Sequence, residues 1–266
     1  MNLLKRELKS NLKSLLIWCA SMAFLIYAGM VKYAAFAKTG DSVNEMMAAF
    51  PKEMLSVFGI KEGSDLTSVA VFYCIFFTYF LLLASVHGVM LGVTILSKEE
   101  HDKTADFLFS KPVSRHKVIA IKFIAAFINI LVFDFVTYLV SVGAVSPYYK
   151  EGSLTFSIFL VIIALFVIQF LFLCIGFCMA AVVKSAKLAS SLASFLVLFA
   201  FLIKVMIDLN KDADFLTFLT PFQYFDPNAV LFDHQFDFGY FLLCIALAAF
   251  STFCTFYFFK KKDLRT

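Results

Sequence analysis

Six long apolar stretches dominate this sequence of 266 residues, and each can cross a lipid bilayer as a helix. A transmembrane helix needs about 20 apolar residues, because each residue adds about 1.5 Å and the hydrocarbon core is about 30 Å thick. The stretches are Leu15–Phe36, Val69–Leu96, Val118–Val145, Leu154–Val183, Leu188–Ile207 and Phe238–Phe259. We therefore predict an all-α integral membrane protein, with residues 1–266 forming one transmembrane domain of six helices.

The composition agrees with this fold class. Hydrophobic residues make up 62% of the chain and charged residues only 16%, whereas soluble domains are roughly 45–50% apolar. The first stretch is too long for the core of a signal peptide and has no small-residue cleavage site after it. We expect it to be the first span.

The distribution of basic residues gives an orientation. If both termini and residues 97–117 are cytoplasmic, 16 of the 23 Lys and Arg residues lie inside and seven lie in outer positions. This excess follows the positive-inside rule. It makes residues 37–68 and 208–237 outer loops, and it explains the net charge of +4 without a nucleic-acid partner.

The first 14 residues have an amphipathic pattern. Leucines and lysines each recur every four residues, as Leu4, Leu8 and Leu12 and as Lys5, Lys9 and Lys13. The pattern predicts an N-terminal elbow helix over residues 1–14 that lies in the membrane surface, with its leucines in lipid and its lysines near anionic headgroups. A basic tail that only obeys the positive-inside rule is the alternative.

Residues 97–117 are a polar segment between two spans, and they are dense in both charge signs. Pro112 prevents a continuous helix through the segment, and Ser114 is a candidate N-cap for the next span. A short charged helix that ends in Phe107 and Leu108 is suited to docking a soluble partner. A solvated loop with no partner is the alternative.

The run KEEHDKTADFLFSKPVSRHKVIAIK resembles the first cytoplasmic loop of the ABC type-two permease family. The shared pattern is an acidic pair, a threonine, an acidic residue, a Phe/Leu pair and a Pro-Val-Ser-Arg ending. Many family members have glycine where this chain has Lys103. The sequences around Pro51 and at 220–226 are similar to the outer loops of the same family.

The resemblance implies the permease subunit of a bacterial ABC exporter with a type V exporter-like fold, in the inner (plasma) membrane. It implies two permease subunits, as a homodimer, and two copies of a soluble ABC ATPase that binds ATP and Mg. Segment 97–117 would be the coupling helix, and its contact residues would be Glu99, Glu100, Asp102, Thr104, Asp106, Phe107, Leu108 and Arg115. This chain has no phosphate-binding GxxxxGK[ST] loop and no hydrolase motif. We therefore expect it to bind no cofactor and to be no enzyme itself.

A few polar residues interrupt the spans. Asp134 is the most costly, because insertion scales give about 2.5–3.5 kcal/mol for a carboxylate at the centre of a span. We identify His87, Asn129, Asp134 and Gln169 as candidate residues of a transport path, with Gln169 as a possible partner of Asp134. For His87 the alternative is a neutral histidine bonded to a neighbouring helix, and for Asp134 it is a structural hydrogen-bonded or protonated carboxyl between helices. Gly88 and Gly92 form a small-residue face for close helix packing.

The 36 phenylalanines and the scarcity of charge in the spans favour a hydrophobic or amphipathic cargo, such as a peptide, toxin or antibiotic. The competing function is a stand-alone proton-coupled carrier that uses Asp134 and His87, although no internal repeat of the kind common in carriers is evident. A membrane enzyme is a third class.

The six cysteines all lie in predicted spans and form no CxxC pair, so we predict no metal site.

Overall fold

The computed structural model describes residues 2–40, 42–51, 54–55, 60, 64–101, 114–149 and 154–262, and within these ranges all regular elements are helices. Six of the described helices are long and apolar enough to span a membrane, which confirms the predicted fold class. They are α1 (Asn2–Thr39), α4 (Val69–His101), α6 (Arg115–Val145), α7 (Thr155–Val182), α8 (Ala186–Leu209) and α10 (Phe238–Lys261).

Short helical elements connect the spans. These are α2 (Ser42–Ala48), η1 (Ser146–Tyr148), η2 (Lys211–Leu219), η3 (Pro221–Gln223) and α9 (Pro227–Phe232). Side-chain caps define several helix starts. Ser114 Oγ accepts a hydrogen bond from the backbone N–H of Lys117 at 3.4 Å, which confirms the predicted cap of α6. Asp237 caps α10 in the same way through the N–H groups of Gly239 and Tyr240.

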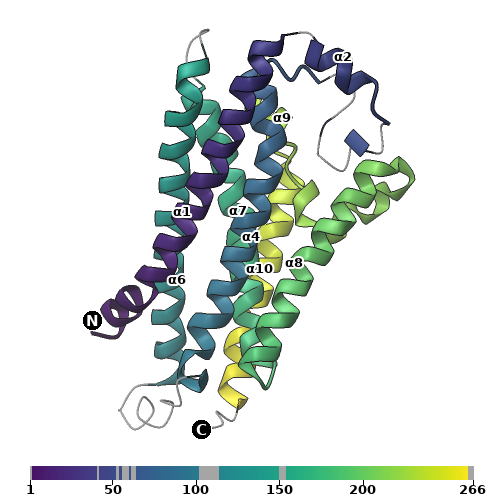
Figure 1. Cartoon of the computed structure of the whole chain (residues 1–266). Coiled ribbons are helices and arrows are strands. Elements are labelled where there is room, and N and C mark those ends of the chain that lie inside the picture. Colours follow the sequence, from purple (N-terminus) through teal and green to yellow (C-terminus); the bar gives the residue numbers. More distant parts are fainter. Residues whose placement is uncertain are drawn as a thin grey trace.

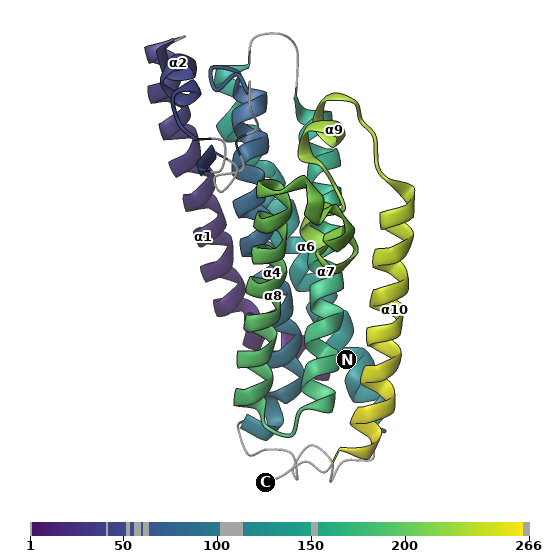
Figure 2. The same ribbon diagram turned by 90° about the vertical axis from the view of Figure 1, so that its right-hand side faces the viewer.

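Helices α4 and α7 form the centre of the bundle and share its most extensive helix contact. α8 packs on α4, α10 packs on α7, and α6 lies between α1 and α7. Figure 2 shows α1 and α10 at opposite edges of the bundle. Fully buried aromatic side chains, among them Tyr73, Phe77, Phe133, Phe172 and Phe177, fill the space between the helices.

The two ends of the bundle differ in what they contain. The start of α1, the ends of α4 and α10, the start of α6 and the turn from α7 to α8 lie at one end of the bundle (Figure 1), which we call the terminal end. The opposite end holds α2, η1 and the segment from η2 to α9. This arrangement is the one that six successive spans require.

Within the predicted elbow segment, two of the three leucines do not lie where the sequence predicted. α1 is one continuous helix from Asn2, although Figure 1 shows its first turns slanting relative to the rest. Leu4 and Leu8 pack against the buried core instead of facing lipid, while Leu12 is 50% exposed. The physical reason is Glu7, which lies on the same helix face and is completely buried against α4. Its ion pair holds that face inside the protein.

Candidate functional site

The close packing of α4 on α7 depends on three glycines. A Cβ atom added at Gly88 would lie 2.6 Å from the carbonyl oxygen of Gln169, and one at Gly92 would lie 2.4 Å from that of Leu173. On the facing helix, a Cβ at Gly176 would lie 2.3 Å from the carbonyl oxygen of Val89. No side chain fits at such distances. The small-residue face of the sequence is therefore where the two backbones come closest.

This close approach brings together three of the predicted path residues, which we call the mid-bundle triad: His87 of α4, Asp134 of α6 and Gln169 of α7. With the Gln169 amide nitrogen facing Asp134, Nε2 donates to Oδ1 at 2.8 Å and to Oδ2 at 3.0 Å. The amide oxygen then accepts from His87 Nδ1 at 2.9 Å. One glutamine thus links an acid to an imidazole across three helices.

The triad is shielded from solvent. The exposed fractions are 5% for Asp134, 2% for His87 and 0% for Gln169. The rings of Trp18 and Phe133 lie 5.3 Å and 4.6 Å from the His87 ring, centre to centre. No lysine or arginine among the described residues contacts Asp134, so its hydrogen-bonding partner is an amide instead of a cation.

Asn129, the fourth predicted path residue, does not join the triad. Its amide nitrogen donates to the backbone carbonyl of Ala125 at 2.8 Å on its own helix. Thr137 bonds back to Phe133 in the same way, at 2.8 Å. Both side chains therefore donate to backbone carbonyls of α6 itself. Such a bond within one helix is a structural role for a polar residue in a span, not evidence for a transport path.

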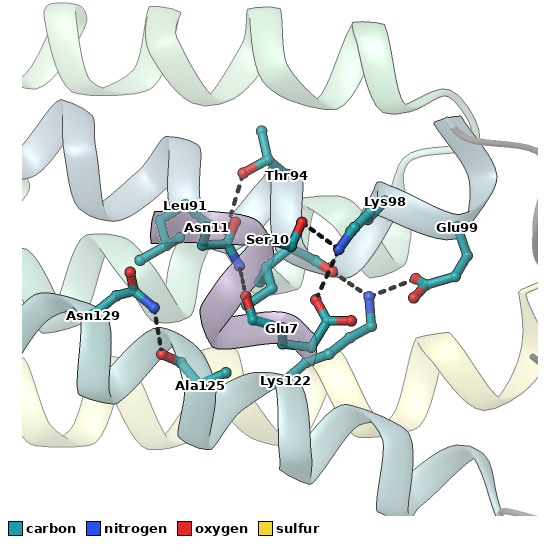
Figure 3. Close-up of polar contacts among 11 residues, drawn as sticks. Glu7, Ser10, Asn11, Leu91, Thr94, Lys98, Glu99, Lys122, Ala125 and Asn129 are labelled. Atoms are coloured by element: carbon teal, nitrogen blue, oxygen red, sulfur yellow. Dashed lines mark hydrogen bonds and ion pairs between the residues drawn. The ribbon is translucent and has the colours of Figure 1, made fainter. Parts of the chain in front are cut away.

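A second polar group lies at the terminal end, and we call it the terminal ion cluster: Glu7 of α1, Lys98 and Glu99 of α4, and Lys122 of α6 (Figure 3). Lys122 Nζ lies 2.5 Å from Glu99 Oε2 and also donates to the backbone carbonyl of Ile95. Lys98 Nζ lies 3.5 Å from Glu7 Oε2 and donates to Ser10 Oγ at 2.7 Å. Two ion pairs thus join α4 to its neighbours.

Three members of this cluster are almost fully buried. The exposed fractions are 0% for Glu7, 1% for Lys122 and 4% for Glu99. Burying charges is costly, so a buried pair survives only when charges balance and geometry is good. The cluster has two acids and two bases, yet Oε1 of Glu7 and Oε1 of Glu99 have no hydrogen-bond partner among the described residues. The cluster is therefore balanced in charge but incompletely hydrogen-bonded.

Polar contacts on the other side of α4 reach α10. Glu100 Oε2 lies 2.9 Å from Nζ of Lys262, which also donates to the carbonyl of Ala180 in α7 at 2.9 Å. Nη1 of Arg115 donates to the carbonyls of Lys260 at 3.2 Å and Lys262 at 3.0 Å. A cation at these carbonyls satisfies orphan acceptors and complements the dipole at the C-terminus of α10.

The residues predicted to couple to an ATPase divide into two groups. Glu99, Glu100 and Arg115 are described, and their side chains bond to other helices of the same chain. Asp102, Thr104, Asp106, Phe107 and Leu108 lie outside the described residues. Apart from the N-cap Ser114, the described part of segment 97–117 belongs to helices, because α4 continues to His101 and α6 begins at Arg115.

Sequence reasoning missed Glu7, Lys122 and Lys262. Each had a usable signal. Lys122 is a lone cation just inside an apolar stretch, and such a residue needs an acidic partner. Glu7 lies three residues after Leu4 and one before Leu8, so it shares their helix face. Lys262 is the last of three consecutive lysines, so its signal was the basic run alone. Which of these lysines pairs with Glu100 depends on the position of α10.

The opposite end contains polar contacts of a different kind. Asp208 is held by Lys204 and by the Gln223 amide, which donates to it at 2.8 Å. The Tyr224 hydroxyl donates to the carbonyl of Phe218 at 2.6 Å. Burial, with smaller contributions from Cys244 and Tyr240, raises the pKa of Tyr224 to about 12. These contacts fasten the segment after α8 to the bundle.

Comparison with known proteins gives one result that covers nearly the whole chain. The family model described as ABC-2 family transporter protein matches residues 1–264. No curated protein matches the chain. With six apolar helices and this match together, the chain belongs to the ABC-2 transporter family and is a multi-pass membrane protein of the kind that forms the permease subunit of an ABC transporter.

Proposed function

We propose that this chain is the permease subunit of an ABC exporter and that a separate ATPase drives it by pushing on residues 97–117. The observation that supports the proposal is the bonding at both ends of the segment from 102 to 113. On one side, the last turns of α4 are ion-paired to α1, α6 and the end of α10. On the other, Arg115 at the start of α6 is bonded to the end of α10.

These bonds give a route for force from a docked partner into the spans. Displacement of the α4 end would move α6 through Glu99–Lys122 and α1 through Lys98–Glu7. Displacement of the α6 start would move α10 through Arg115. Buried ion pairs have strict geometry, so they transmit a displacement or break. Alternating access would follow from tilting these helices together.

The charge pattern supports a cytoplasmic terminal end. With that orientation, 16 of the 23 basic residues lie inside, in accordance with the positive-inside rule. Segment 97–117 then faces the compartment that holds ATP. In the proposed assembly, two copies of this chain in a bacterial inner membrane bind two ATPase subunits, which hold ATP and Mg.

The burial of the mid-bundle triad bears on the transport path. Asp134, His87 and Gln169 are at most 5% exposed, and buried aromatic side chains fill the neighbouring space. In the proposed cycle, cargo moves along a surface that opens when helices tilt or along the contact between two copies. Large apolar side chains are exposed along the described spans, so we propose a hydrophobic or amphipathic cargo, such as a peptide, toxin or antibiotic.

Co-purification tests the partner. The tagged chain is isolated in mild detergent as wild type and as the double variant Phe107→Ala/Leu108→Ala. A matched control is Phe215→Ala/Leu219→Ala, which removes an exposed Phe/Leu pair at the opposite end, where the residues are 73% and 62% exposed. We expect wild type and control to retain an ATPase and the first variant to lose it. Absence of any ATPase from wild type in several detergents contradicts the proposal.

A second experiment separates docking from force transmission. The variant Glu100→Gln removes the ion pair with Lys262 while leaving residues 102–113 unchanged. In proteoliposomes that contain the ATPase, we expect normal ATP hydrolysis with reduced cargo export. Equal loss of hydrolysis and export would instead place Glu100 in the docking contact itself.

The mid-bundle triad favours one alternative function, a proton-coupled carrier. Its supporting observation is the hydrogen-bonded link from Asp134 through Gln169 to His87. The variant Asp134→Asn distinguishes the two functions in proteoliposomes. A carrier loses transport driven by a pH gradient, whereas the proposed exporter keeps ATP-driven transport. ATP-independent, pH-driven uptake in wild type that disappears in the variant would support the carrier.

A further inference from the structure

A hollow of about 440 Å³ lies between α1, the α2 region and α4 near the opposite end of the bundle. Its wall is almost entirely apolar. The residues that matter for the argument are Leu25, Lys32 and Phe36 on α1, Met47 on α2, and Ile75 and Phe76 on α4. The volume falls in the lower part of the 300–1,000 Å³ range of small-molecule sites.

The α1 wall of the hollow is one continuous helix stripe. Leu25, Lys32 and Phe36 are spaced by seven and four residues, so they share a face over about 16 Å of helix. Gly29 lies on the same stripe, and a Cβ atom there would come within 2.8 Å of the Phe76 ring. The missing side chain lets that ring lie directly against α1.

Among the described residues that line the hollow, Lys32 is the only lysine or arginine. It forms no ion pair or hydrogen bond with any other described residue. The side chain is exposed, and the preceding residue Val31 is 69% exposed. A cation without a partner among the described residues, at an apolar hollow beside a lipid-facing surface, has the chemistry to hold an anionic headgroup with its chain.

We propose that this hollow is a binding site for an anionic single-chain amphiphile of the bilayer. The apolar chain would lie between Leu25, Met47 and Phe76, and the carboxylate or phosphate would contact Lys32. A cationic amphiphile lacks an acidic partner in the described wall, and a neutral one leaves Lys32 unpaired. Met47 adapts to chains of different shape, because methionine is unbranched and polarizable.

This site goes beyond the transport proposal and does not depend on an ATPase. The test therefore uses the permease alone, in nanodiscs of phosphatidylcholine. The probes are a photoreactive long-chain fatty acid and a photoreactive amine of equal chain length. After illumination, labelled peptides are identified by mass spectrometry. In wild type we expect the fatty acid to label peptides of α1 and α4 that line the hollow, and the amine to label them much less.

Three variants sharpen the result. Lys32→Gln should lower fatty-acid labelling about fivefold, the size expected for one partly exposed charge contact. Lys32→Glu should reverse the preference in favour of the amine. Lys38→Gln, which removes an exposed lysine on the same helix outside the hollow, should leave labelling unchanged.

Filling the hollow tests its apolar part. Met47→Trp places bulk from the short α2 helix into the space and should reduce labelling by both probes, without touching the α1–α4 contact. Labelling that is spread evenly over all spans, and that neither Lys32→Gln nor Met47→Trp changes, would overturn the proposal in favour of ordinary annular lipid. Either result leaves the ATPase-coupling proposal untouched, because no ATPase is present in the experiment.

Discussion

The terminal ion cluster and the mid-bundle triad are both buried polar groups, but they are stabilised in different ways. The ion cluster balances two acids with two lysines at the end of the bundle. The triad places one acid at mid-bundle with an amide and an imidazole as partners, and no lysine or arginine among the described residues contacts it. One group relies on paired charge and the other on hydrogen bonds.

This difference separates two roles for polar residues in a membrane bundle. Paired charges at the end of the spans lie where a soluble partner can act on them, and their geometry links four helices. The hydrogen-bonded triad links α4, α6 and α7 at the place where α4 and α7 are closest. We infer that the first group transmits movement and that the second fixes helix register.

The largest effect is expected for Lys122→Met, because this change leaves the Glu99 carboxylate buried without a cation. Removing one partner of a buried pair typically costs about 3–5 kcal/mol. Thermal unfolding of the purified protein in one detergent measures it. The double variant Glu99→Gln/Lys122→Met removes both charges and should recover most of the loss. A single variant as stable as wild type would show that the pair carries no net charge interaction.

A smaller loss is expected for Gly92→Ala, which tests the helix contact that holds the triad together. The added Cβ would lie 2.4 Å from the Leu173 carbonyl oxygen, so α4 and α7 must separate. Overpacking of this kind costs about 1–3 kcal/mol. Gly143→Ala in α6 is the control, because a Cβ there meets nothing within 4 Å. Equal melting temperatures for the two variants would refute the close contact.

The change Asp134→Asn should have a still smaller effect on stability, about 1 kcal/mol, because the amide oxygen keeps the 2.8 Å contact from Gln169 Nε2 and only the 3.0 Å contact to the second oxygen is lost. Asp134→Leu removes the acceptor and leaves a buried N–H unpaired, at a cost of about 1–3 kcal/mol. The comparison of the two variants isolates the hydrogen bond from the charge. If Asp134→Asn were as harmful as Lys122→Met, the triad would depend on charge after all.

The smallest effect concerns Asp65 at the opposite end, an exposed carboxylate held only by hydrogen bonds. It accepts from the Thr67 hydroxyl at 2.6 Å, from Asn44 at 2.9 Å and from the Thr67 N–H at 2.9 Å, which lowers its pKa. Because the folded pKa lies below the unfolded value, its stabilisation is present above about pH 4 and is lost as the pH falls through the folded pKa.

The variant Asp65→Asn should therefore lose slightly less stability than wild type when the pH falls below about 4. Near neutral pH, the change of the unfolding free energy with pH should be the same in both proteins. Unfolding midpoints between about pH 3 and pH 7 measure this difference. An identical acid profile in both proteins would show that the contacts of Asp65 do not discriminate between its protonation states.

The spans were predictable because their signal is local. Six apolar stretches of sufficient length can satisfy their backbone groups in a bilayer only as helices, and all six are present. The N-cap at Ser114 and the glycine face at Gly88 and Gly92 are also short patterns with one physical meaning. Likewise, Asp134 and His87 stand out because ionisable residues are rare in apolar segments.

Partner choice needed the tertiary structure. The sequence named Gln169 as a possible partner of Asp134, which is confirmed, but only the approach of α7 at the glycines showed that the same amide also reaches His87. From the sequence, Glu7 belongs to a basic amphipathic helix. In the structure, Lys98 of α4 lies beside it, and Leu4 on the same face packs against the core as well. The sequence by itself determined which segments enter the membrane, because that depends on the apolar content of each segment. The tertiary structure decided which buried charges meet, because that depends on distances between helices far apart in the chain.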